Sequence, residues 1–210
     1  MGYKVQFLCM FILLGCMGVS PLMGQQQISS TQQQIMGAVS AAPDSLQAEA
    51  KVLGYNADTT LATLRNGSNN LVCLADDPRE PEFHVACYHK GLAPFMARGR
   101  ELKGEGMSRK EVDLIRRSEI KSGKLSMPEK PMALYSLSGS KDAVNYKDET
   151  IEDVSALYVI YIPFATESST GLPGKPIGSG VPWLMEPGTP WAHIMVSGGE
   201  KISKKIKVDH

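Results

Sequence analysis

Two cysteines and two histidines lie close together in the sequence, and these residue types are the ones that bind zinc. The four residues are Cys73, His84, Cys87 and His89, and thiolates and imidazoles form most structural zinc sites. The two histidines are five positions apart, which separates them by about 140° around a helix, so they cannot both face one ion. The sequence therefore predicts no metal site.

The same two cysteines are better suited to a disulfide. The chain has four cysteines, and Cys9 and Cys16 lie in the apolar N-terminal segment, so Cys73 and Cys87 remain as a single pair once that segment is removed. In an oxidising compartment such a pair is normally a disulfide. The bond would close a loop of about 15 residues. In the chain-entropy model, closing such a loop stabilises the folded state by about 3 kcal/mol.

A second group of residues combines aromatic, titratable and thioether side chains near the C-terminus. On an extended strand from Trp191 to Val196, the side chains of Trp191, His193 and Met195 point to one face. Trp183 and the Gly/Pro-rich loop 165–182 flank this strip. We expect it to line a small-molecule or glycan pocket. The same pattern also allows helices to cover the face, in which case Trp191 belongs to the core.

Catalytic motifs are missing from the sequence, so we predict no catalytic residue and no cofactor. There is no Gly-x-Ser-x-Gly elbow and no kinase, protease or phosphate-loop pattern. A cysteine enzyme built on Cys87 and His193 would need a free thiolate. The oxidising compartment that an exported protein enters disfavours a free thiolate. The leading interpretation is a non-catalytic ligand- or partner-binding module of the cell envelope. The alternative is an extracytoplasmic hydrolase with a site near His193 and the 165–182 loop.

The elements that position the cysteines are predicted to be a hairpin and a helix. The run Thr59–Leu64 resembles a strand, Asn66-Gly67 is a strong turn signal because both residues tolerate positive φ, and Leu71–Ala75 is the expected return strand. A helix is expected over Pro81–Lys90, where the four-residue spacing of Phe83 and Cys87 would place both side chains inward. Cys73 then lies on a strand and Cys87 on the following helix.

Further helices and strands are predicted along the rest of the chain. A helix over 94–103 is followed by a capping box, Ser108 to Glu111, that begins a helix over 109–121 with Val112, Leu114 and Ile115 facing inward. Strands are expected at 131–137, 156–164, 183–185 and 192–196, with an exposed loop over 138–153. Residues 98–124 hold nine basic and five acidic residues, which favours a solvated basic face over a lipid- or polymer-binding patch.

The first 24 residues have the pattern of a signal peptide, with Lys4 followed by an apolar run from Val5 to Leu14. Cleavage near Gly24 predicts a periplasmic or secreted protein. The alternative is a lipobox ending at Cys16, which predicts a membrane-anchored lipoprotein. The full chain has 22 basic and 22 acidic residues. Removal of Lys4 with the signal peptide leaves 21 basic residues against 22 acidic ones. This near-neutral balance argues against a nucleic-acid-binding protein and against a general anion-binding protein.

The mature chain is predicted to contain one domain. Residues 25–42 form a flexible Gln/Ser-rich spacer, 43–196 a single α+β domain, and 197–210 a basic flexible tail. A short helix over 43–52 or a strand over 50–55 begins the domain. The predicted fold is a small, mainly antiparallel sheet packed with about three helices on one side and one disulfide.

Three segments resemble small exported bacterial proteins of an uncharacterised family. They are Leu64–Asn69 leading to Cys73, the segment that carries Cys87, and Gly188–Met195. One departure is Leu71, where the family pattern has a large aromatic side chain. The resemblance covers about half of the mature domain, and it implies export and this architecture but no activity.

Overall fold

The fold is taken from a computed structural model that describes residues 1, 2 and 28–206. The predicted signal peptide, apart from its first two residues, lies outside the described residues, and so do Cys9 and Cys16. The spacer prediction is tested only from residue 28 onward, and the tail prediction only as far as Ile206.

A sheet of ten strands organises the molecule, and it is larger than the small sheet predicted from the sequence. Its main path runs β2-β1-β3-β4-β5-β7-β9-β8, and β6 and β10 both pair with β7. Every pairing is antiparallel except β1 with β3. The strands are β1 (Lys51–Tyr55), β2 (Leu61–Arg65), β3 (Leu71–Leu74), β4 (Phe83–His89), β5 (Met132–Gly139), β6 (Val144–Asn145), β7 (Thr150–Tyr161), β8 (Trp183–Met185), β9 (His193–Ser197) and β10 (Ile202–Lys205).

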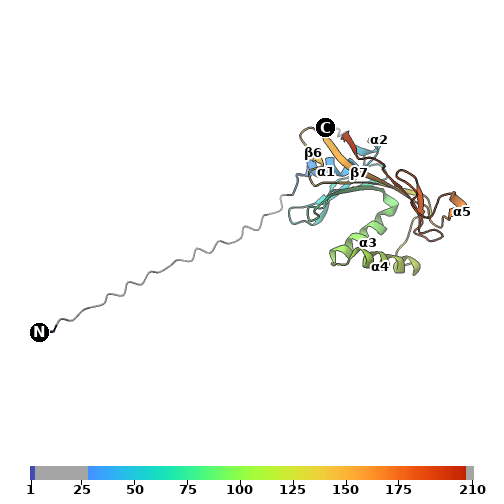
Figure 1. Ribbon diagram of the computed structural model, residues 1–210, viewed down its shortest axis with the longest axis horizontal. Coiled ribbons are helices and arrows are strands. Elements are labelled where there is room, and N and C mark those ends of the chain that lie inside the picture. Colours follow the sequence, from blue (N-terminus) through green and yellow to red (C-terminus); the bar gives the residue numbers. More distant parts are fainter. Residues whose placement is uncertain (3–27, 207–210) are drawn as a thin grey trace.

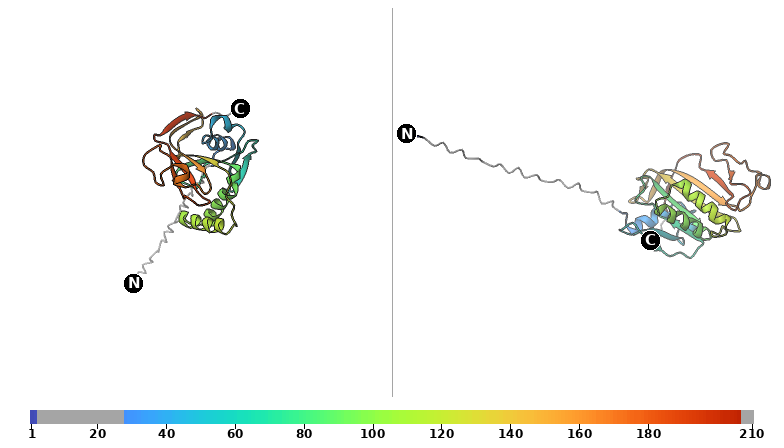
Figure 2. Two further views of the ribbon diagram at one scale, coloured as in Figure 1. Left: turned by 90° about the vertical axis from the view of Figure 1, so that its right-hand side faces the viewer. Right: turned by 90° about the horizontal axis from the view of Figure 1, so that it is seen from below.

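Helices lie on both faces of this curved sheet, whereas the sequence predicted about three helices on one side. Figure 1 shows α1 and α2 above the sheet and α3 and α4 below it, and Figure 2 shows α3 and α4 lying across the lower face. Their bounds are α1 (Thr31–Val39), α2 (Asp44–Gln47), η1 (Lys90–Leu92), α3 (Ala93–Gly104), α4 (Arg109–Lys121) and α5 (Glu167–Thr170). The chain is therefore an α+β protein with two layers of helix around one sheet.

Side chains alternate between two hydrophobic clusters, one on each face of the sheet. On β3, Leu71 and Cys73 join the cluster under α1, whereas Val72 joins the cluster under α3 and α4. On β7, Ala156 faces the first cluster and Val159 the second. This period of two is the signature of strands covered on both faces.

The predicted helix over 81–90 is wrong, because this segment forms β4 between β3 and β5. Phe83, Val85 and Cys87 are buried in the α1-side cluster. The four-residue spacing of Phe83 and Cys87 fits a strand as well as a helix, since four is a multiple of two. The central position between two strands then decides the conformation. The Cys73–Cys87 disulfide is confirmed, and it joins neighbouring strands instead of a strand and a helix.

The predicted hairpin between 59–64 and 71–75 is also wrong, because β1 lies between β2 and β3. The alternative strand over 50–55 is confirmed as β1. Neither Asn66 nor Gly67 has positive φ. Gly67 instead passes very close to the preceding backbone: a Cβ there would lie 2.2 Å from Lys51 N and 2.5 Å from Glu49 O. The glycine is required by this close approach.

Residues predicted to be a flexible spacer contain the helix α1, whose apolar residues are buried against the sheet. Ser30 and Gln33 form a capping box at its start. Gln34 then fastens the helix to the end of β1, because its side chain accepts a hydrogen bond from Tyr55 N (2.8 Å) and donates one to Tyr55 O (3.0 Å). The polar composition that suggested a spacer is therefore used for capping and docking.

Two other predicted irregular segments contain strands. Part of the expected 138–153 loop forms β6 and the start of β7, because β7 begins at Thr150. Within the expected tail, β10 pairs with this same part of β7, and Ile206 enters the α1-side core. Short polar strands such as β10 carry too little apolar alternation to be recognised from sequence.

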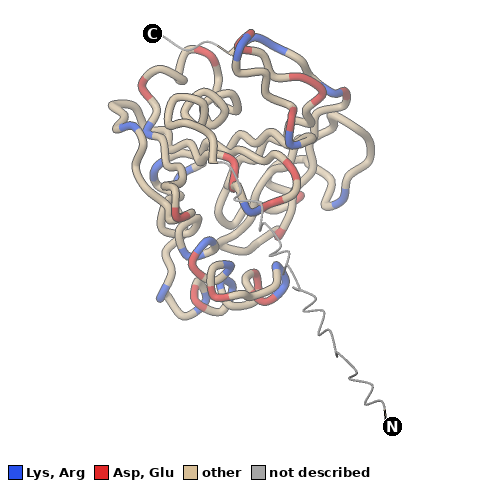
Figure 3. The backbone as a smooth tube through the Cα atoms, turned by 90° about the vertical axis from the view of Figure 1, so that its left-hand side faces the viewer, with Lys and Arg blue, Asp and Glu red and all other residues tan. Residues whose placement is uncertain are grey.

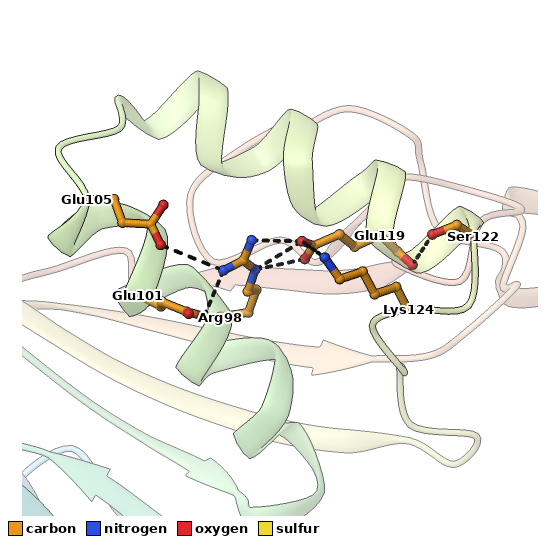
Figure 4. A network of polar contacts seen from close by, with 6 residues as sticks. All are labelled: Arg98, Glu101, Glu105, Glu119, Ser122 and Lys124. Atoms are coloured by element: carbon orange, nitrogen blue, oxygen red, sulfur yellow. Dashed lines mark hydrogen bonds and ion pairs between the residues drawn. The ribbon is translucent and has the colours of Figure 1, made fainter.

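The helices α3 and α4 form a pair that is held together by ion pairs. The capping box from Ser108 to Glu111 is confirmed, as is the helix that follows it. Arg98 on α3 binds Glu119 on α4 through Nη2 at 2.8 Å and binds Glu101 through Nη1 at 2.7 Å, and Figure 4 shows this network. Basic and acidic residues are interspersed along both helices in Figure 3, so the basic excess of this region is partly compensated within it.

Candidate functional site

Packing between α3–α4 and the sheet is incomplete and leaves a cavity of about 570 Å³. Ligand pockets in proteins commonly measure about 300–1,000 Å³, so this one has the size of a small organic molecule. Its floor is the sheet, its roof is the two helices, and the β8–β9 turn closes one end. The floor and turn contribute His84, Leu134, Leu157, Val159, Tyr161, Met185, Glu186, Trp191, His193 and Met195; the helices and their connection contribute Phe95, Met96, Gly99, Lys103, Met107, Arg109, Val112, Asp113, Arg116 and Arg117.

Three of the four residues singled out in the sequence lie in this wall. Trp191, His193 and Met195 line the cavity, whereas Ala192 and Ile194 point to a separate cluster on the opposite face. Trp183 is directly opposite Met195 in the β8–β9 ladder but does not line the cavity. The strip predicted from strand alternation is therefore present, without Trp183.

Trp191 is both a core residue and a cavity wall. Its side chain is buried in the cluster under α3 and α4, and its ring meets the Phe95 ring edge-on at a centroid distance of 4.7 Å. The helices do cover this face of the sheet, as the alternative interpretation required. They do not fill it, because the cavity remains between Trp191, Val159 and Met195.

His193 is buried and its tautomer is fixed by the backbone. Its Nδ1 lies 2.7 Å from the carbonyl oxygen of Trp191. A carbonyl oxygen can only accept, so Nδ1 carries the hydrogen and Nε2 is left as an acceptor. Burial lowers the pKa of His193 below its ordinary value, with opposing contributions from the Trp191 carbonyl and Glu186. The imidazole is therefore neutral near pH 7.

Arg116 extends from α4 between two aromatic rings. Its guanidinium carbon lies 4.1 Å from the centroid of Phe95 and 4.8 Å from that of Trp191. Its Nη2 donates to Asp113 Oδ1 at 2.8 Å, while its Nε is buried without a partner among the described residues. Gly99 leaves room for the group, since a Cβ there would lie 3.0 Å from Arg116 Nη1. A cation is thus held firmly against the roof of an apolar cavity.

Arg117 and Glu186 join α4 to the β8–β9 turn at the edge of the cavity. Arg117 Nη2 lies 2.7 Å from Glu186 Oε1, and the second nitrogen, Nη1, binds Oε2. The Arg117 guanidinium also lies over Trp191, 4.7 Å from the ring centroid. The hydrogen bonds from Arg117 lower the pKa of the Glu186 carboxyl group, and the same hydrogen bonds raise the pKa of the Arg117 guanidinium. The pair is a two-point carboxylate–guanidinium contact.

The turn that carries Glu186 holds this residue in an unfavourable backbone conformation. Its φ is +55°, which costs a residue with a Cβ roughly 1–2 kcal/mol. The turn is fixed by a hydrogen bond from Thr189 Oγ1 to Glu186 O (2.8 Å) and by one from Gly188 N to Ala165 O (2.7 Å). The carboxylate is therefore presented to α4 by a rigid turn.

Charge is distributed unevenly over the cavity wall. Four basic residues line it against two acidic ones, which leaves a formal excess of two positive charges. They are Lys103, Arg109, Arg116 and Arg117 against Asp113 and Glu186. Lys103 is paired outside the cavity with Glu80. Most other lining side chains are aliphatic, aromatic or thioether groups, so the site combines an apolar body with a cationic rim.

The hydrolase alternative requires a nucleophile or an acid–base pair near His193. The lining residues include no serine, threonine or cysteine that could act as a nucleophile. Glu186 is engaged by Arg117, and within residues 28–206 His193 has no hydrogen bond to an acid. Cys73 and Cys87 are consumed by the disulfide. The part of the chain that the structure describes holds no group of three His, Cys, Asp or Glu side chains able to bind a metal ion.

The sequence interpretation missed the residues that give the cavity its charge. It placed Leu114 inward, but this side chain is 57% exposed. The residues of α4 that line the cavity are Arg109, Val112, Asp113, Arg116 and Arg117. Their spacing of three and four residues is the helical signal that could have identified them. Three of these five residues are arginines. Apolar periodicity does not detect them, because it depends only on hydrophobic residues.

No protein-family model, curated protein or solved structure matches the chain. Among the described residues, none of the helices is long and apolar enough to cross a lipid bilayer.

Proposed function

We propose that the protein is an exported, non-catalytic binding protein that holds one small organic ligand between α3–α4 and the sheet. The observation that carries this proposal is the cavity of about 570 Å³ between the two helices and the sheet, whose wall is mainly apolar. A cavity of this size at the junction of helices and a sheet is a typical position for a ligand.

The lining supports a ligand with an apolar body. The aromatic rings of Phe95, Tyr161 and Trp191 form one part of the wall, and their edge-on contacts keep them fixed. Four methionines line other parts, and their flexible thioethers adapt to irregular ligand shapes. They are Met96, Met107, Met185 and Met195.

Export is supported by the disulfide and by the leader pattern. Cys73 and Cys87 are bonded within the core, and such bonds persist mainly in oxidising compartments. Mass spectrometry of the protein purified from its natural envelope tests this part. A mature N-terminus near Gln25 supports a periplasmic or secreted protein, a diacylated Cys16 supports a lipoprotein, and an intact Met1 contradicts export.

Ligand binding is tested by titrating the neutral apolar dye Nile red into the full mature chain. Val159 lies on the cavity floor, so Val159→Phe should fill the cavity and abolish saturable binding of one dye per chain. Ile160 is the matched control, because it is adjacent on β7 and faces the opposite side of the sheet, where it is partly exposed. Ile160→Phe should bind like the wild type.

If Val159→Phe does not fold, Met96→Phe fills the same cavity from α3 and replaces it in the comparison. A filled variant that binds Nile red as strongly as the Ile160→Phe control contradicts the proposal.

A further inference from the structure

The cationic groups of the cavity are incompletely compensated. The Arg116 side chain is only 13% exposed, and its one ion pair uses a single nitrogen of the guanidinium. Its Nε has no partner among the described residues. Burying a cation costs free energy unless it is paired and fully hydrogen-bonded, and Asp113 satisfies Arg116 only in part. The roof of the cavity therefore favours an occupant that carries negative charge.

Glu186 shows which negative group the rim accepts. Its carboxylate is bound by both terminal nitrogens of Arg117, in the planar two-point geometry that guanidinium and carboxylate groups share. The two side chains are 26% and 41% exposed, respectively. Because both side chains reach solvent, water screens the pair, and a ligand carboxylate on Arg117 would keep the same two-point contact that Glu186 makes.

An exchange at this position would place the head of a ligand beside the apolar floor. Arg117 and Glu186 line the same cavity as Leu157, Val159 and Met195. A carboxylate on Arg117 thus leaves an attached hydrocarbon chain free to lie on β7 and β9. Burial of that chain supplies binding free energy that the internal carboxylate of Glu186 cannot supply, because Glu186 is anchored in its turn.

We infer that the ligand is an amphiphilic monocarboxylate, such as a medium-chain fatty acid, whose carboxylate replaces Glu186 on Arg117 while its apolar chain fills the cavity. Glu186 is then an internal competitor that occupies the anion position in the empty protein. Arg116, fixed between Phe95 and Trp191, adds a positive potential behind this position. This inference rests on the proposed function, because it names the ligand of the same cavity.

The test is calorimetric titration of the full mature chain with three ligands of equal chain length: decanoate, decanol and decylamine. Decanoate should bind at least tenfold more tightly than decanol, and decylamine should bind least. Arg117→Gln should reduce decanoate affinity to the level of decanol and leave decanol binding unchanged. Lys110→Gln removes the same charge from the same helix outside the cavity wall and should change neither affinity by more than twofold.

Glu186→Gln distinguishes competition from a structural role. Both Arg117→Gln and Glu186→Gln break the same ion pair, so a merely structural pair predicts weaker decanoate binding in both variants. Competition predicts opposite outcomes, with Glu186→Gln binding decanoate several-fold more tightly than the wild type. Each variant is also melted, and Glu186→Gln alone decides the question if Arg117→Gln does not fold.

The possible failures of the two proposals differ. Equal affinity for decanoate and decanol, or weaker decanoate binding in Glu186→Gln, overturns the carboxylate inference while leaving a ligand-binding cavity in place. Tighter binding of decyl phosphate than of decanoate overturns it as well. Absence of binding by all these compounds and by Nile red overturns the proposed function itself.

Discussion

Cys73 and Cys87 lie directly opposite each other on β3 and β4, with Cα atoms 4.0 Å apart and the disulfide crossing the ladder between two central strands. Both residues have no exposed surface. The bond therefore pins the register of β3 against β4 inside the core on the α1 side of the sheet. A reducing agent can reach it only after this part of the sheet opens.

Replacing both cysteines, Cys73→Ala with Cys87→Ala, should lower the free energy of unfolding by about 3 kcal/mol, because the bond closes a short loop in the unfolded chain. Guanidinium unfolding of the double variant against the oxidised wild type measures the change. Thiol titration of the wild type should find no reactive thiol from this pair without reductant. A difference in unfolding free energy below about 0.5 kcal/mol contradicts the prediction.

Gly67→Ala should destabilise the domain by roughly 1–3 kcal/mol, since the new methyl group would overlap the backbone at Lys51 and force it to move. The matched control is Gly104→Ala at the end of α3, where a Cβ meets no atom within 4 Å. Thermal unfolding should show a lower Tm for the first variant and an unchanged or higher Tm for the second. Equal Tm values for the two variants would contradict the prediction and would show that the 65–69 segment moves to accommodate the methyl group.

Lowering the pH should destabilise the fold through His193. Burial lowers the pKa of this imidazole in the folded protein, whereas in the unfolded chain it is about 6.5. The unfolded chain thus binds more protons between the two pKa values, so the free energy of unfolding falls as the pH drops below about 6.5. Above that pH the contribution is fully present.

Urea unfolding at pH 8, 7, 6 and 5 measures this dependence. His193→Asn keeps a donor for the Trp191 carbonyl but does not titrate, so it should lose stability less steeply than the wild type between pH 7 and 5. Between pH 8 and 7 the two slopes should agree. Parallel curves over the whole range would assign the acid sensitivity to other groups.

Ile206→Ala should cost roughly 2–4 kcal/mol, because Ile206 is buried in the same cluster as Ala38 and Val39 of α1. Lys205→Ala, at the exposed neighbouring position, should change stability by less than about 0.5 kcal/mol. Chemical unfolding of both variants makes the comparison. Similar small effects would mean that the C-terminal segment is only loosely attached, as the sequence suggested.

Local signals were the ones that could be interpreted from the sequence. The capping box at Ser108 depends on four consecutive residues, and the strip of Trp191, His193 and Met195 depends on one strand. Both could be predicted because their geometry is fixed within a few residues of chain.

Features that depend on distant partners could not be predicted. Insertion of β1 between β2 and β3 is decided by a parallel pairing that no turn residue encodes. The choice of strand over helix for β4 is made by its two neighbours in the sheet. The charged part of the site has the same limitation, since Arg117 and Glu186 are 69 residues apart and meet only when α4 reaches the β8–β9 turn.

The pairing of β10 with β7 and the burial of Ile206 beside α1 also determine when the fold can be completed. The earliest described helix and the last described residues share one core, and Figure 1 shows these two ends of the domain side by side. A chain that emerges from the ribosome or through a membrane channel from its N-terminus cannot close this core until residue 206 has emerged. The core on the α1 side of the sheet is therefore completed only at the end of synthesis, after the rest of the sheet has become available for pairing.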